Sequence, residues 1–193
     1  MHACASRNPF TIGGPVMPQP WDVPPAPANG DSHEDGITRA VGRALTSWEY
    51  IEEELANTFA ILVNADMSDL ERAPAFRAYG SIPTARGRAD MLDAAAEAYF
   101  YNNPNPQLQS EFDDILRNYR GLAGRRNDIA HGRTGQDSQS PAHGWYLYPG
   151  LYNSKKYPIG GSPKYLYSSV EIKRFQEEFE KLYDEIVDFA TKL

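Results

Sequence analysis

Residues 107–132 read QLQSEFDDILRNYRGLAGRRNDIAHG, and this stretch decides the fold expected for the chain. Its apolar side chains recur at steps of four and three residues, the spacing of one buried face of a helix. They are Leu108, Phe112, Ile115, Tyr119, Leu122 and Ile129. Arg126 stands where the series calls for one more apolar residue. Because a buried guanidinium is costly unless it is paired or faces a polar cleft, Arg126 indicates a functional site.

The residues around Arg126 have a usable geometry. Asn127 and His131 are four positions apart and therefore share a face of the helix, while Arg126 lies one step round. Gly132 is expected to end the helix as its C′ residue, which places His131 in the last turn. Histidine titrates near neutral pH, and an arginine fork holds a phosphate through two hydrogen bonds. These residues suit acid/base chemistry at a phosphodiester.

The pattern of Arg126, Asn127 and His131 at the end of a helix resembles the signature of the HEPN superfamily, whose fold is an all-helical bundle. The resemblance covers roughly residues 36–193. It implies a metal-independent endoribonuclease that cleaves RNA as a homodimer, with the motifs of two chains meeting in one cleft. His131 would then be the general acid/base, Arg126 would stabilise the phosphate, and Asn127 would position the substrate. The family also implies a role as a toxin or in antiviral defence, with an antitoxin or other regulator as a further partner.

A second interpretation stays open, in which the chain is a non-catalytic HEPN-like module for binding or assembly. Arg126 and Asn127 would then join helix ends through hydrogen bonds to carbonyl oxygens, and His131 would be an ordinary helix-terminal residue. The net charge of −7 supports this interpretation, because proteins that coat nucleic acid are usually basic.

Charge is nevertheless distributed unevenly along the chain. The stretch 117–133 holds five arginines and a single aspartate, Asp128. Arg125 and Arg133 flank the motif within it, and we expect them to bind an anionic substrate confined to this site. The competing interpretation is a solvated helix end, where basic residues are favoured in any case.

Several classes of protein are disfavoured by composition. The one cysteine, Cys4, excludes a disulfide or a thiolate metal site within one chain. No apolar run approaches the roughly 20 residues of a membrane span, and the N-terminus lacks the features of a signal peptide. The spacing of Asp128, His131, Asp137 and His143 matches no metal-ligand pattern. We therefore expect a cytoplasmic protein without metal, cofactor or membrane association.

Proline marks the expected division of the chain. Residues 1–35 are Pro-rich, with seven of the fifteen prolines in residues 1–34, and are expected to form a disordered tail. Residues 36–193 then form one helical domain. Its first three helices are expected at about 36–64, 70–79 and 84–101, with Thr84 as an N-cap. Arg86 and Arg88 can reach the cleft of Arg126 from the third helix, although exposure to solvent is the simpler expectation for both.

Residues 133–168 change character and form an aromatic insert. Trp145–Tyr148 and Tyr165–Tyr167 are expected to be two short strands, joined by a loop with Lys155 and Lys156. Aromatic and lysine side chains together can stack on unpaired bases, but packing against the bundle is the preferred interpretation.

The last helix begins at a capping-box pattern, Ser168 with Glu171. Its apolar face serves equally well as core or as a dimer interface. That face is Phe175, Phe179, Leu182, Ile186, Phe189 and Leu193. The fold class expected for the chain is mainly α, an antiparallel helical bundle with a small β-hairpin inserted before the C-terminal helix.

Overall fold

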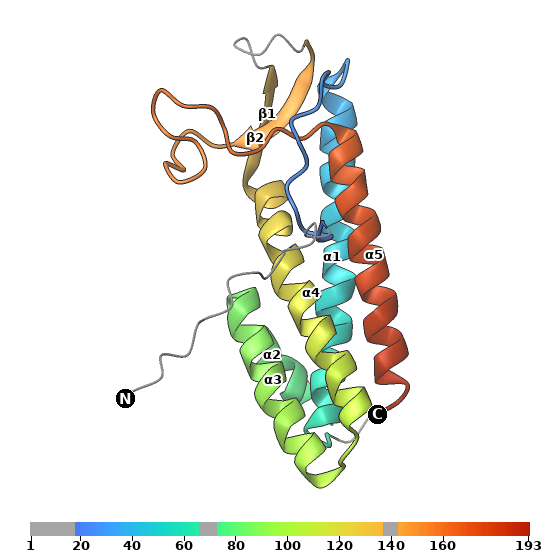
Figure 1. Cartoon of the computed structure of the whole chain (residues 1–193). Coiled ribbons are helices and arrows are strands. Elements are labelled where there is room, and N and C mark those ends of the chain that lie inside the picture. The colour runs from blue at the N-terminus through green and yellow to red at the C-terminus, as the bar shows by residue number, and fades with distance from the viewer. Residues whose placement is uncertain (1–17, 66–72, 137–142) are drawn as a thin grey trace, which may run out of the picture.

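The first and last helices, α1 and α5, pack side by side along the length of the molecule (Figure 1). The computed structural model describes residues 18–65, 73–136 and 143–193. Within them the elements are α1 (Glu34–Leu62), α2 (Ala73–Gly80), α3 (Ala85–Asn102), α4 (Pro106–His131), β1 (Gly132–Gln136), β2 (Trp145–Pro149) and α5 (Ser169–Ala190). The expected class, a helical bundle with a two-stranded antiparallel hairpin before the last helix, is confirmed.

Aromatic side chains fill the space between α1, α4 and α5. The indole of Trp48 stacks on Tyr119, with ring centroids 5.3 Å apart, and meets Phe179 edge-on at 5.2 Å. Phe112 stacks on Phe189 at 4.6 Å. Each such ring, once removed from water, contributes roughly 1.5–3 kcal/mol. The apolar face of α5 is therefore the core of a single chain, from Ile172 to Phe189.

Helices α3, α4 and α5 begin at polar side chains that accept hydrogen bonds from free backbone N–H groups. The expected cap at Thr84 is confirmed, since its Oγ1 accepts from the amide of Gly87 at 3.1 Å. The expected capping box before α5 is also confirmed. There the amide of Ser168 donates to the Glu171 carboxylate at 2.8 Å, and the Ser168 hydroxyl accepts from Val170.

In the hairpin, β2 pairs with a different strand from the one expected. β2 pairs with β1, from Gly132 opposite Pro149 to Gln136 opposite Trp145. The expected strand at Tyr165–Tyr167 forms only an isolated bridge, between Tyr167 and Leu147. Helix α4 ends at His131 as expected, but Gly132 is its C-cap and leads directly into β1 instead of taking the expected C′ position. Its backbone is extended (φ −73°, ψ 158°), and glycine suits the position because a Cβ would lie 2.6 Å from Leu147.

Part of the expected N-terminal tail belongs to the folded domain. Residues 1–17 lie outside the described residues, but 18–33 lie against the helices (Figure 1). Trp21 packs against the core, and Asp31 exchanges backbone hydrogen bonds with Trp145 at 2.9 and 2.8 Å. The Asp31 carboxylate also accepts from the amide of Ser169 at 2.7 Å. The folded domain therefore begins before residue 36, and the expectation that residues 18–33 belong to a disordered tail is wrong.

Among the residues that the structure describes, no helix is long and apolar enough to cross a bilayer.

Candidate functional site

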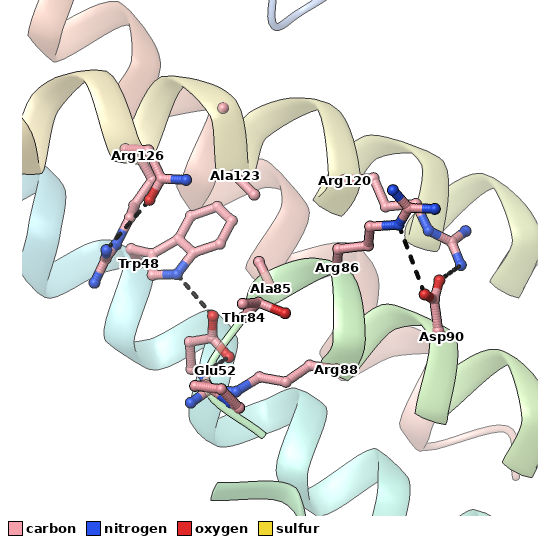
Figure 2. Close-up of a pocket in the computed structure, with 13 residues that line it drawn as sticks. Trp48, Glu52, Thr84, Ala85, Arg86, Arg88, Asp90, Arg120, Ala123 and Arg126 are labelled. Atoms are coloured by element: carbon pink, nitrogen blue, oxygen red, sulfur yellow. Dashed lines mark hydrogen bonds and ion pairs between the residues drawn. The ribbon is translucent and has the colours of Figure 1, made fainter. Parts of the chain in front are cut away.

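A pocket of about 740 Å³ lies beside the second half of α4, where α4 faces α1 and the start of α3. Figure 2 shows its walls, with the arginines at both ends and Trp48 between them. The charged residues of its lining are Glu52, Arg86, Arg88, Asp90, Arg120 and Arg126. Arginine thus predominates in a protein whose net charge is −7.

Arg126 lines this pocket, which explains its place in the apolar series of α4. Leu122 and Ile129 are buried on either side, while the Arg126 side chain keeps 31% of its surface exposed. Its nearest polar contacts are long, 3.6 Å from a terminal nitrogen to Glu49 and 3.5 Å to the Asn127 side chain. Its Nε is buried without a hydrogen-bond partner among the described residues. The guanidinium is therefore held in place but weakly paired.

Glu52 forms the floor of the pocket, and the sequence alone did not identify it. Its carboxylate, 11% exposed, accepts four side-chain hydrogen bonds. The donors are Trp48 Nε1 at 2.9 Å, Tyr79 OH at 2.8 Å, Tyr119 OH at 3.0 Å and a terminal nitrogen of Arg88 at 2.7 Å. Arg88 also donates from Nε to the carbonyl of Ile82 at 2.9 Å, so its side chain is largely buried and the expected exposure to solvent is wrong. The one available signal was the position of Glu52 on the apolar stripe of α1, four residues after Trp48.

The two tyrosines at Glu52 are held neutral. Burial raises the pKa of Tyr79 far above its ordinary value, and the charges and hydrogen bond of the neighbouring Tyr119 and Glu52 add to this. Burial likewise raises the pKa of Tyr119, with a further contribution from Glu52. Both hydroxyls therefore stay protonated and donate hydrogen bonds to the carboxylate.

The opposite end of the pocket is an exposed ion-pair cluster. Arg120 lies 3.3 Å from Asp90 and 3.3 Å from Asp93, and Arg86 lies 3.8 Å from Asp90 (Figure 2). Surface pairs of this kind contribute about 0–1 kcal/mol. This end is therefore polar and adaptable, whereas the floor at Glu52 is fixed.

Arg125 points to a different set of partners. Its terminal nitrogen lies 3.1 Å from the Asp128 carboxylate and 3.2 Å from the Tyr167 hydroxyl. Asp128 is 1% exposed, and it also contacts the Lys156 ammonium. Burial raises the pKa of Tyr167, and the nearby charge of Asp128 raises it further. Arg125, expected to bind substrate, is instead part of this buried polar cluster and does not line the pocket.

His131 and Arg133 lie beyond the pocket. His131 is the last residue of α4 and is exposed, as its expected position in the final turn requires. At 3.6 residues per turn, Arg126 and His131 point about 140° apart around the helix axis. Arg133, on β1, places its guanidinium carbon 4.6 Å above the ring of Tyr148. The structure thus joins Arg126 and Asn127 in one pocket and leaves His131 outside its walls.

The described residues hold no group of three or more His, Cys, Asp or Glu side chains arranged for a metal ion. Asp128 is committed to Arg125 and Lys156, and Asp137 lies outside the described residues.

Comparisons of the chain with protein-family models, curated proteins and solved structures found no match. The resemblance to the HEPN superfamily therefore rests on Arg126, Asn127 and His131 at the end of a helix in an all-helical bundle. A function derived from it is a proposal.

Proposed function

We propose that the protein is a metal-independent endoribonuclease of the HEPN type, with its site at the end of α4. The observation that carries this proposal is Arg126, a half-buried arginine in a core position whose polar contacts with the described residues are 3.5 Å or longer. A guanidinium in this state is prepared to bind a phosphate, because the cost of burying it is already met by the fold. Asn127 lines the same pocket.

The reaction uses the ribose itself as nucleophile. The 2′-hydroxyl loses a proton and attacks phosphorus, the P–O5′ bond breaks, and the leaving 5′ oxygen takes up a proton. The products are a 2′,3′-cyclic phosphate and a 5′-hydroxyl end. His131 transfers protons, Arg126 stabilises the pentacoordinate phosphate, and Asn127 positions the strand.

A second copy of the chain completes the site in this proposal. Each chain supplies one His131, whereas cleavage needs a proton removed on one side and delivered on the other. His131 and Arg126 also point in different directions around α4. A homodimer with the ends of α4 facing one another supplies both groups. The cytoplasmic location and the toxin or antiviral role belong to the same proposal.

The first prediction concerns cleavage of RNA in EDTA. Wild-type protein is expected to give 2′,3′-cyclic ends and to behave as a dimer in solution. His131→Ala is expected to lower the rate by about 10²–10⁴, the usual contribution of general acid/base catalysis. Arg126→Ala is expected to lower it by about 10²–10³ through loss of charge stabilisation. The measurement is the single-turnover rate on a labelled RNA, with the mass of each variant recorded.

Arg117→Ala is the matched control, because Arg117 lies on the same helix, outside the pocket, and pairs with Asp114 at the surface. Its cleavage rate is expected to equal that of the wild type. Equal loss of activity in Arg117→Ala and Arg126→Ala would count against a specific site.

A non-catalytic binding module is the second candidate, and two observations favour it. His131 lies outside the pocket walls, and Arg126 has Glu49 as a distant partner. This candidate predicts no cleavage of any RNA by a folded wild-type protein. Arg126→Ala would then change stability or partner binding alone.

A further inference from the structure

A loop between β2 and α5, residues 150–164, projects sideways from the bundle beside the hairpin (Figure 1). We call it the projecting loop. It begins where β2 ends, on the strand paired with β1, and β1 follows His131 directly. The projecting loop therefore stands at the same end of the molecule as the motif.

The projecting loop is held in shape by its own backbone. The amide of Asn153 donates to the carbonyl of Gly150 at 2.9 Å, and that of Tyr157 donates to the carbonyl of Asn153 at 2.7 Å. Lys164 closes the loop by donating to the carbonyl of Lys156 at 2.8 Å. A surface that is already ordered loses little conformational entropy when a ligand binds.

The base of the projecting loop is fastened to the motif. The Lys156 ammonium contacts the Asp128 carboxylate, and Asp128 lies between Asn127 and His131 in the chain. The hydroxyl of Tyr165, just after the loop, donates to the backbone carbonyl of Asp128 at 3.0 Å. The base of the projecting loop therefore contacts the turn of α4 that carries Asn127 and His131.

The outer part of the projecting loop is both apolar and basic. Leu151, Tyr152 and Ile159 are 64%, 81% and 103% exposed, although large apolar side chains are normally covered. Lys155 and Lys164 are also exposed, and neither forms an ion pair within the described residues. Residues 143–170 contain no aspartate or glutamate at all. A protein of net charge −7 thus presents an uncompensated positive surface here.

We propose that the projecting loop binds the single-stranded RNA substrate, with Tyr152 stacking on an unpaired base and Lys155 and Lys164 contacting phosphates. Unpaired bases offer flat apolar faces between negative charges, which matches the composition of this surface. The hairpin tyrosines Tyr146 and Tyr148 are buried, so they pack against the domain as expected and leave stacking to Tyr152. This inference rests on the proposed function, because it names the substrate surface of the same site.

The test measures binding apart from cleavage, in the full chain carrying His131→Ala. A fluorescent oligouridine of about 12 nucleotides is titrated by anisotropy between about 50 and 200 mM salt. Tyr152→Ala is expected to weaken binding about tenfold through loss of one stacked base. Lys155→Gln with Lys164→Gln is expected to lower the slope of log affinity against log salt by about 1.4, for two phosphate contacts on a single strand.

Two matched controls lie away from the projecting loop. Tyr101 is 86% exposed near the end of α3, and Tyr101→Ala is expected to leave affinity unchanged. Lys173→Gln with Lys181→Gln removes two exposed charges from α5 and is expected to leave the salt slope nearly unchanged. Thermal unfolding of each variant confirms that it remains folded.

The outcomes separate this inference from the proposed ribonuclease. If the loop variants lose RNA binding but wild-type protein cleaves nothing, the loop is an RNA-binding surface and the catalytic proposal fails. If wild-type protein cleaves RNA and the loop variants bind like the controls, the inference is overturned. It is also overturned if Tyr152→Ala leaves RNA binding intact but abolishes dimerisation or binding to vesicles of phosphatidylserine and phosphatidylcholine.

Discussion

At the scale of single residues, Glu52 links more of the molecule than any residue of the motif described above. Its four donors come from α1, α2, α3 and α4. Since those donors are buried or half-buried, removing their common acceptor leaves several polar groups unsatisfied, among them the Arg88 guanidinium.

We predict that Glu52→Ala lowers the free energy of unfolding by about 3–5 kcal/mol, the usual cost of breaking a buried ion pair on one side. Glu52→Gln keeps an acceptor but loses the charge, so a smaller loss of about 1–3 kcal/mol is expected. Urea unfolding measures both. Glu53→Ala, one residue along and exposed, is the control and is expected to change stability by less than about 0.5 kcal/mol. Equal effects at the two positions would contradict the network.

Sequence reasoning found Arg126 and missed Glu52 for one physical reason. Arg126 interrupts a regular series, so the pattern itself marks it. Glu52 sits beside Ile51 at a point where either residue fits the stripe, and its partners are 27, 36 and 67 residues away. Asp128 is similar, because its partner Lys156 lies in an insert whose path local patterns do not define.

At the scale of elements, two glycines of α4 have opposite surroundings. A Cβ at Gly121 would lie 2.3 Å from the Trp21 ring, whereas a Cβ at Gly124 would meet nothing within 4 Å. Gly121 therefore admits the N-terminal segment against α4, and Gly124 leaves the pocket open. The sequence showed both glycines but not this difference, since Trp21 lies in a segment expected to be a tail.

We predict that Gly124→Ala raises the free energy of unfolding by up to about 1 kcal/mol through helix propensity. Gly121→Ala gains the same propensity but displaces Trp21, and a net loss of about 1–3 kcal/mol from overpacking is expected. In a Trp21→Ala background the Gly121→Ala change should become neutral or stabilising. Denaturant titration of the wild type, Gly121→Ala, Trp21→Ala and the double variant tests this cycle, and the same titration measures Gly124→Ala. A Gly121→Ala change that stabilises the wild type would contradict the contact between Gly121 and Trp21.

In the hairpin region, the local sequence pattern does not predict which segments form strands. β1 reads GRTGQ, with two glycines and no apolar alternation, so nothing in it suggests a strand. It is extended because it follows α4 without a loop and pairs with β2, whose residues are nearly all buried. Tyr165–Tyr167 has the stronger strand composition but contributes a single bridge, on an edge of β2 where Asp31 already pairs with Trp145.

At the scale of the whole molecule, the buried tyrosines of the two polar clusters make stability depend on pH. Burial raises the pKa of Tyr79, Tyr119, Tyr165 and Tyr167 above the ordinary value near 10. In the unfolded chain these groups ionise near pH 10, while in the folded chain they stay neutral. Their contribution to the free energy of unfolding is therefore complete below pH 10 and is lost as the pH rises above it.

We predict a free energy of unfolding that is level from about pH 8 to 9 and then falls, by roughly 1.4 kcal/mol per pH unit for each tyrosine. Urea unfolding at successive pH values measures the slope, and ultraviolet absorbance counts the phenolates formed before unfolding. Tyr165→Phe should reduce the slope by one tyrosine, whereas the exposed Tyr101→Phe should not. Stability that stays level to pH 11 would contradict the assignment.

The helical class of the domain was predictable because the long helices carry apolar stripes, and because α3 and α5 also carry recognisable N-caps. Which helices pack against one another was not predictable, because an apolar stripe of this kind fits several partner helices. The pairing of α1 with α5 is a case in point, since the face of α5 read equally well as a dimer interface.

The packing of α1 against α5 has a consequence for the synthesis of the protein. Asp31, just before α1, also binds the first residue of α5. The carboxylate of Asp31 meets Ser169 across 138 positions of chain, and α1 has α5 as its main neighbour. Ribosomes add about 5–20 residues each second, so α1 is finished several seconds before its neighbour exists. During that interval the side of α1 that packs against α5 is uncovered, and it is then a natural target for a chaperone.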